Sequence, residues 1–177
     1  MHADKLITFI ADDRPGLIER LSEVVIEHGG NWLESRMSQL RGKFAGIVHI
    51  SVPKARVTEM ERALTALEAQ GLTLRLESAP HTRSARAMVP WQLEIVGHDR
   101  PGIVHEFAAA LAQRGINVVD MRTDIGSAPM SAGLLFSATA EIRVPAGLDI
   151  DELREGLESL ADELTIEYTL APQRESA

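Results

Sequence analysis

Hydrophobic and polar residues follow two different periods along this chain, and the periods alternate in the same order twice. Residues 5–11 are rich in strand-forming residues, and period two, typical of a strand with one buried face, is found in residues 44–52. Between them, apolar residues from Leu17 to Val25 recur at the spacing of an amphipathic helix. The same succession returns in residues 91–95, 103–111 and 136–145.

Each half of the chain adds two further predicted strands and one helix. Second strands are predicted over residues 32–40 and 118–125, and closing strands over residues 72–76 and 165–169. The second helices have apolar residues three or four apart, at Val57, Met60, Leu64 and Leu67 and at Ile150, Leu153, Leu157, Leu160 and Leu164. The order βαββαβ with right-handed crossovers predicts an α+β fold: two tandem ferredoxin-like units, each an antiparallel sheet with helices on one face.

An internal duplication explains why the order repeats. A shift of 86 residues places Asp-Arg-Pro-Gly at residues 13–16 on the same four residues at 99–102. At the same shift Gly29, Asn31 and Arg36 recur, as Gly115, Asn117 and Arg122. A match at constant spacing indicates repeated units rather than chance. The second copy is longer, around residues 126–130.

The predicted domain boundaries follow from where the periods stop. Residues 1–78 form the first domain and residues 91–171 the second. Residues 79–90 carry Pro, Ser and charge without either period, so they are the expected linker, and residues 172–177 are the expected tail. Each predicted sheet has edge strands without a neighbour on one side. One arrangement that the sequence allows is therefore that an edge strand of one domain pairs with an edge strand of the other, which would give one continuous sheet.

Glycine and proline mark the expected ends of the first helix in each copy. Pro15 and Pro101 are expected in the first helical turn, where a missing N–H group costs nothing. Gly29 and Gly115 are expected to end these helices.

Composition and charge narrow the function classes. The chain has no cysteine, which excludes disulfides, thiolate metal sites and cysteine nucleophiles. Its formal net charge of −8, without a basic stripe, argues against direct nucleic-acid binding. No stretch is long and apolar enough to span a bilayer, and no signal peptide is present, so we expect no membrane association and a cytoplasmic protein.

Catalytic and metal-binding motifs are missing from the sequence. There is no GxSxG, GxGxxG or P-loop pattern, and no Ser and His are placed as nucleophile and base. His98 and His105 are too far apart in sequence for a helical metal-ligand pair, so neither a metal site nor a cofactor is expected.

The Asp-Arg-Pro-Gly motif after the first strand, the amphipathic helix, Gly-x-Asn and the βαββαβ order resemble the ACT domain, a small-molecule-sensing module of amino-acid metabolism. The resemblance covers both copies. A pair of such domains, with residues 127–133 and Phe136 in the second, is similar to the glycine cleavage system transcriptional repressor family. That family implies glycine-modulated contact with a DNA-binding activator. Formyltetrahydrofolate deformylases share the N-terminal likeness but continue into a catalytic domain, which is missing if this chain is complete.

The resemblance also names candidate ligand-binding residues, in the loop after the first strand and at the start of the second. They are Asp13, Gly16, Leu17 and Asn31 in the first copy and Asp99, Gly102, Ile103 and Asn117 in the second. Helix N–H groups reached past the glycine suit a carboxylate, and the aspartate suits an ammonium group, so a zwitterion fits. The alternative is that Asp-Arg-Pro-Gly is only a good helix entry.

Three functions remain open at this point. The first, and the one we expect, is a regulatory protein rather than an enzyme, which senses a small amino acid such as glycine or serine and acts on a regulatory protein partner, as a homo-oligomer. The second is a structural or interaction module without a ligand. The third is the regulatory part of an enzyme.

Overall fold

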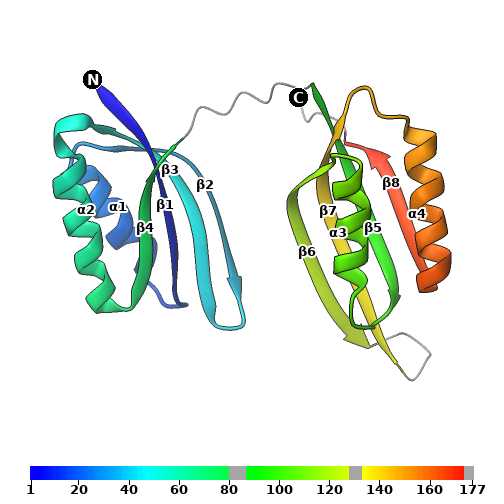
Figure 1. Ribbon diagram of the computed structural model, residues 1–177. Helices are drawn as coiled ribbons and strands as arrows, with labels where there is room; N and C mark the ends of the chain where they lie inside the picture. Colours follow the sequence, from blue (N-terminus) through cyan, green and yellow to red (C-terminus); the bar gives the residue numbers. More distant parts are fainter. Residues whose placement is uncertain (80–86, 128–132, 174–177) are drawn as a thin grey trace. The chain divides into compact units, whose positions relative to one another are not determined.

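The chain divides into two compact units, Met1–Thr82 and Arg83–Ala177. The structure is a computed structural model that describes residues 1–79, 87–127 and 133–173 (Figure 1). Parts of the expected linker and tail, and most of the longer second-copy loop, lie outside the described residues.

The first unit contains two helices and a four-stranded antiparallel sheet with the order β2-β3-β1-β4. Two short 3₁₀ turns, Lys54–Arg56 and Leu67–Gln70, flank its second helix. The elements are β1 (His2–Asp12), α1 (Leu17–Glu27), β2 (Asn31–Leu40), β3 (Lys43–Pro53), α2 (Val57–Ala66) and β4 (Leu72–Ser78).

The second unit repeats this order, with the sheet β6-β7-β5-β8. Its elements are β5 (Met88–His98), α3 (Ile103–Gln113), β6 (Asn117–Ser127), β7 (Leu134–Pro145), α4 (Ile150–Leu164) and β8 (Ile166–Pro172). Two βαββαβ units with this strand order confirm the predicted α+β, ferredoxin-like fold.

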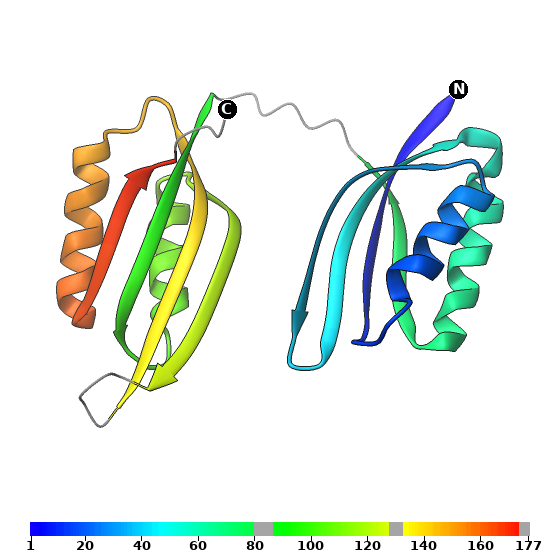
Figure 2. The ribbon, with the colours of Figure 1, turned by 180° about the vertical axis from the view of Figure 1, so that it is seen from behind.

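The core of each unit lies between its two helices and one face of its sheet, as both views show (Figures 1 and 2). In the first unit, Ile7 and Phe9 of β1 and Val48 and Ile50 of β3 face Leu21 of α1. In the second unit, one cluster contains the corresponding apolar residues. No polar or charged residue is buried among the described residues, so hydrophobic burial alone holds each core together.

Backbone geometry differs from the sequence prediction at several element ends. β5 begins at Met88, so residues 88–90, which were expected in the linker, belong to the second sheet. Pro15 and Pro101 lie in turns, before the first helical residues Leu17 and Ile103, so their expected place in the first helical turn is wrong. Thr165, predicted to begin the last strand, instead ends α4 in the left-handed conformation with φ 56°. A Thr is rarely found in this conformation, which is why periodicity extended the strand by one residue.

The edge strands β2 and β6 share an irregularity that periodicity does not reveal. Each has a register shift against its neighbour, at Leu33 in β2 and at Val119 in β6. The extra residue reverses the alternation, so Glu34, Arg36 and their counterparts Asp120 and Arg122 lie on the sheet face away from the helices.

The helix-facing core allows a matched stability test within α1. Leu21 is fully buried, whereas Ile26 is 73% exposed on the same helix. We expect Leu21→Ala to lower the free energy of unfolding by about 2–5 kcal/mol, because it removes buried methyl groups and leaves a cavity. Ile26→Ala is expected to change it by less than about 0.5 kcal/mol. Urea denaturation measures both, and equal effects of the two substitutions would contradict this description of the core.

Candidate functional site

The loop between β1 and α1 is fixed to the neighbouring hairpin by its backbone. The Asp13 N–H donates to the Gly42 carbonyl at 2.8 Å. In the second unit, the Asp99 N–H donates to the Leu134 carbonyl at 2.9 Å. This bond places each aspartate at the carboxyl end of the first strand, directly before the helix.

The helix that follows begins at a left-handed glycine with no side-chain cap. Gly16 has φ 87° and Gly102 has φ 100°, and the first-turn N–H groups of neither helix donate to a capping side chain. The start of α4 is different, because the Asp149 carboxylate accepts from the N–H of Asp151 at 2.9 Å. The first-turn N–H groups of α1 and α3 are therefore without the side-chain acceptor that α4 has.

Of the two adjacent acids at the end of β1, one is already paired. Asp12 forms an ion pair with Lys43 on the neighbouring strand. The hydrogen bond and the charge of Lys43 lower the pKa of Asp12 below its ordinary value. Among the described residues no side chain pairs with the carboxylate of Asp13 or of Asp99, and both aspartates are exposed. Asp13 and Asp99 are thus the acids available to a cation.

The arginines of the two loops have different partners, which the sequence analysis missed. Arg14 donates to the Gln70 carbonyl, and Arg20 Nη1 donates to the Gln70 side-chain oxygen at 2.9 Å. Arg100 instead pairs with Glu106 of α3, with 3.0 Å between Nη2 and Oε1. The only sequence signal was that Glu106 corresponds to Arg20, so a charge is reversed between copies.

A hollow of ≈ 340 Å³ opens at the first loop. It is lined by Asp13, Arg14, Pro15, Gly16, Leu17, Ile18, Glu19 and Phe44. Three predicted site residues, Asp13, Gly16 and Leu17, thus line one space. It combines an unpaired carboxylate, an uncapped helix start and an aromatic wall.

Asn31 is not near this loop within its own unit. It lies opposite Ser51 on β3, whereas Asp12 lies opposite Lys43 at the other end of that strand. Eight residues of strand separate the two positions, about 26 Å. Asn117, opposite Arg143, is as far from Asp99 in the second unit. A ligand that contacts both the aspartate and the asparagine of the predicted set would need these two residues from different domains.

Arg36 and Arg122 lie near the middle of the two edge strands, on the face away from the helices. Arg122 Nε is 3.9 Å from Asp120 Oδ2, and its side chain is 88% exposed. Neither arginine reaches a loop of its own unit, because Arg36 lies opposite Ile47 and Arg122 opposite Thr139. A direct ligand role inside one unit has no geometric support.

Comparison with known proteins assigns the fold to a family. The ACT domain profile matches residues 5–77 and residues 91–170. The chain belongs to the ACT domain family. Both copies are therefore ACT domains, in agreement with the resemblance seen in the motifs.

Similar proteins extend over both ACT domains. The glycine cleavage system transcriptional repressor of Escherichia coli (strain K12) is 26% identical over 171 residues, which cover 93% of this chain and 87% of the repressor. The repressor of Shigella flexneri gives the same values. A crystal structure of a protein from Galdieria sulphuraria has a TM-score of 0.83 and 26% identity, and covers 98% of this chain and 100% of that one. These likenesses support a regulatory ACT protein.

Metal binding and membrane insertion receive no positive indication. In the part of the chain that the structure describes, no three His, Asp or Glu side chains gather in a way that could hold a metal ion. None of the described helices is both long and apolar enough to cross a bilayer.

The left-handed glycines Gly16 and Gly102 should contribute to the stability of the fold. We expect Gly16→Ala and Gly102→Ala each to lower the free energy of unfolding by about 1–2 kcal/mol, because a Cβ is disfavoured at a left-handed position. Gly126→Ala is the control, since Gly126 has open space around it and no positive φ. Chemical denaturation gives the three values. Loop variants as stable as the Gly126 variant would show that the left-handed turn is not required.

Proposed function

We propose that this tandem ACT protein binds a small amino acid at its β1–α1 loops and passes the signal on by protein contacts, without catalysis. The observation that carries the proposal is the pairing, in both copies, of an uncapped helix start with an aspartate that has no side-chain partner. The helix start offers a positive partial charge, and the aspartate offers a full negative charge. A zwitterion has groups for both.

Charge determines which part of the loop binds which group of the ligand. The ligand carboxylate accepts from N–H groups at the start of α1 or α3, where the helix dipole favours an anion. The ammonium group pairs with Asp13 or Asp99. A simple anion such as phosphate suits the site less well, because it would lie beside an uncompensated carboxylate. Glycine and serine, with side chains of no or little bulk, are the ligands we propose to test first.

The position of Asn31 and Asn117 supports a site shared with a second ACT domain. When two β2-type edges pair in antiparallel fashion, the start of one strand lies beside the end of the other. The start carries the asparagine, and the end lies beside the partner domain's β1–α1 loop. The asparagine, which both donates and accepts hydrogen bonds, then reaches a ligand that its own domain cannot bring to it.

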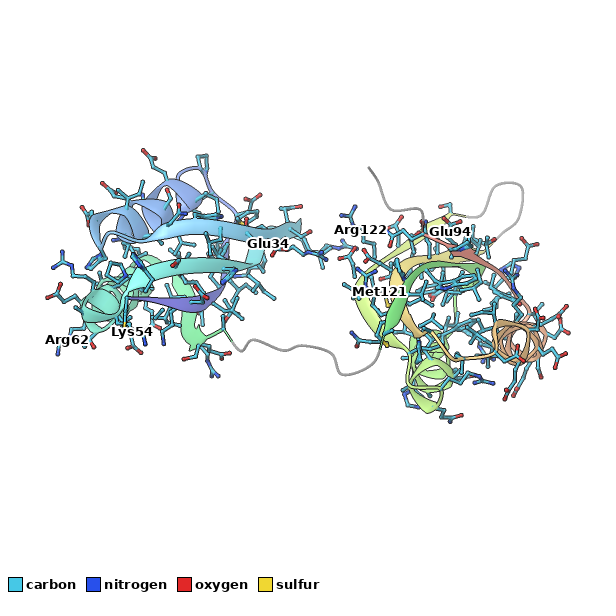
Figure 3. The ribbon with its side chains drawn as sticks, turned by 90° about the horizontal axis from the view of Figure 1, so that it is seen from above. Glu34, Lys54, Arg62, Glu94, Met121 and Arg122 are labelled. Carbon is cyan, nitrogen blue, oxygen red and sulfur yellow. The ribbon has the colours of Figure 1, made fainter. Side chains whose placement is uncertain are left out.

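The edge strands carry charges that suit such pairing. Glu34 and Arg36 of β2 are two residues apart on the same face, as are Asp120 and Arg122 of β6. Figure 3 labels Glu34 on β2 and Arg122 on β6, each to be viewed within its own unit. In an antiparallel pair centred between them, each acid lies opposite an arginine. An acid and an arginine at the same positions in both copies therefore favour edge pairing between ACT domains.

Regulation follows if the ligand is held by two domains at once. A ligand shifts a pairing equilibrium only by its difference in affinity for the two states, typically about 1–3 kcal/mol. The paired state, with ligand, is then the form that a partner protein distinguishes. The repressor relatives support a role in transcriptional regulation, and the net charge of −8 supports contact with a protein rather than with DNA.

Substitution of the aspartates tests the ligand site. We expect Asp13→Ala and Asp99→Ala, made singly and together, to weaken binding of glycine or serine by about tenfold to a hundredfold, the effect of one lost charge-assisted hydrogen bond. Isothermal titration calorimetry measures the affinity. Asp12→Ala is the matched control: it removes the adjacent carboxylate, which Lys43 already neutralises, and should leave the affinity unchanged.

Two outcomes would count against this site. If the folded double variant binds as well as the parent, the Asp-Arg-Pro-Gly motif is only a helix entry. If the parent gives no heat with any standard amino acid, the protein is a ligand-free interaction module.

Direct DNA binding is expected to be negligible at physiological salt. The net charge of −8 repels the phosphate backbone, and the basic residues form no stripe in the sequence that would release counterions from DNA. An electrophoretic mobility shift assay with the purified protein alone checks this, and a salt-dependent shift at micromolar protein would overturn the mode of action proposed here.

A further inference from the structure

The outer edge of β4 in the first unit exposes backbone groups to pairing. The Ala79 N–H donates to the Asp4 carbonyl at 3.1 Å, so this pair is hydrogen-bonded across β1 and β4. Hydrogen-bonded and non-hydrogen-bonded pairs alternate in an antiparallel ladder. Glu77 and Arg75 therefore also bond to β1, whereas the N–H and C=O groups of Leu74 and Leu76 point to the free edge.

The corresponding edge of the second unit is protected. The same alternation directs the Leu170 backbone of β8 outwards, and Arg154 Nη2 of α4 donates to the Leu170 carbonyl at 3.1 Å. Pro172, which has no N–H, occupies the next outward position. A side chain on the edge and a proline are two of the devices that prevent a further strand from adding.

The first unit has neither device. Glu61 follows the buried Met60 of α2 as Arg154 follows the buried Leu153 of α4, and a carboxylate cannot donate to a carbonyl. The position of Pro172 is taken by Ser78. Between α2 and β4 lies a groove of ≈ 300 Å³, lined by Glu61, Leu64, Thr65, Leu74, Arg75, Leu76 and Glu77.

The charges along β4 make this edge complementary to itself. Arg75 and Glu77 lie on the face away from the helices, opposite Thr8 and Leu6 of β1. In a two-fold antiparallel pair centred on Leu76, each Arg75 lies opposite Glu77 of the second copy. This pair falls at a non-hydrogen-bonded position, where cross-strand side chains come closest. Leu76 lies opposite its own mate, at a hydrogen-bonded position that its outward backbone groups can satisfy.

We propose that the β4 edge of the first unit binds the same edge of a second copy of this chain, joining the two sheets about a two-fold axis at Leu76. Such an interface is isologous, so one surface provides both halves and the assembly closes as a dimer. The second unit cannot form the equivalent pair, because Arg154 and Pro172 occupy its edge and Thr169 and Ala171 replace the charged pair. This interface is separate from the loops that the proposed function uses.

A charge exchange tests the register. We expect Arg75→Glu or Glu77→Arg to weaken self-association of the full chain by about tenfold, because each converts two symmetric attractions into repulsions. The double variant Arg75→Glu/Glu77→Arg restores opposite charges across the axis and should recover the parent dissociation constant. Glu61→Arg, which recreates the donor of the second unit, should also weaken association. Thr169→Glu on β8 is the matched control and should have no effect.

Sedimentation equilibrium measures these constants. A parent chain that remains monomeric up to millimolar concentration would overturn the proposal, as would single variants that associate like the parent. Failure of the double variant to recover association would also contradict it. Glycine binding by the Arg75→Glu variant, measured by calorimetry, reports separately on the proposed function.

A disulfide provides a second test that does not depend on charge. Because the chain has no cysteine, Leu76→Cys introduces a single thiol that lies opposite itself across the proposed axis. Cα atoms of a hydrogen-bonded pair are about 5.5 Å apart, within disulfide range. Mild oxidation should give a disulfide-linked dimer on non-reducing gels. Ser78→Cys would face Leu74 of the mate, so it should not crosslink, and equal crosslinking of both variants would contradict the register.

Discussion

Hydrophobic burial on one face of each sheet is the constraint on which the rest of the structure depends. The two helices of a unit cover that face, and no polar or charged residue is buried among the described residues. The other face and the two outer strands of each sheet therefore keep groups that only water or another chain can satisfy. A few side chains distinguish one edge from another. The edge strands β2 and β6 carry an acid and an arginine, and Arg154 covers the edge of β8 by donating to the Leu170 carbonyl. The edge of β4 has no such donor in the described part of the chain and lies beside an open groove.

The left-handed glycine at the start of α1 and α3 connects the backbone to the candidate site. Its conformation turns the chain from strand to helix within a few residues, and it leaves the helix start without a capping side chain. A serine or aspartate at that position would cap the helix and would also place an oxygen where we propose that a ligand carboxylate binds. The same residue type therefore serves the fold and leaves the site open, which explains why the motif alone could not separate a helix entry from a binding loop.

Periodicity and repetition predicted the elements and their order, because burial on one face leaves a strong pattern in the sequence. They did not predict that Asn31 lies at the far end of the sheet from Asp13, although the right-handed crossover implies it: β2 runs parallel to β1, so it starts where β1 starts. The Asp12–Lys43 ion pair and the hydrogen bond from Arg154 to the Leu170 carbonyl depend on which residues face each other across strands and helices. No local pattern records such contacts.

We propose that the repeated loops bind an amino acid with help from a second domain. The most direct measurement is an ¹H–¹⁵N NMR titration of the full chain with glycine. We expect the largest shifts on first-turn amides of α1 or α3, such as Leu17 or Ile103, and on the asparagine at the start of β2 or β6. Shifts confined to other regions, or none at millimolar glycine, would contradict it.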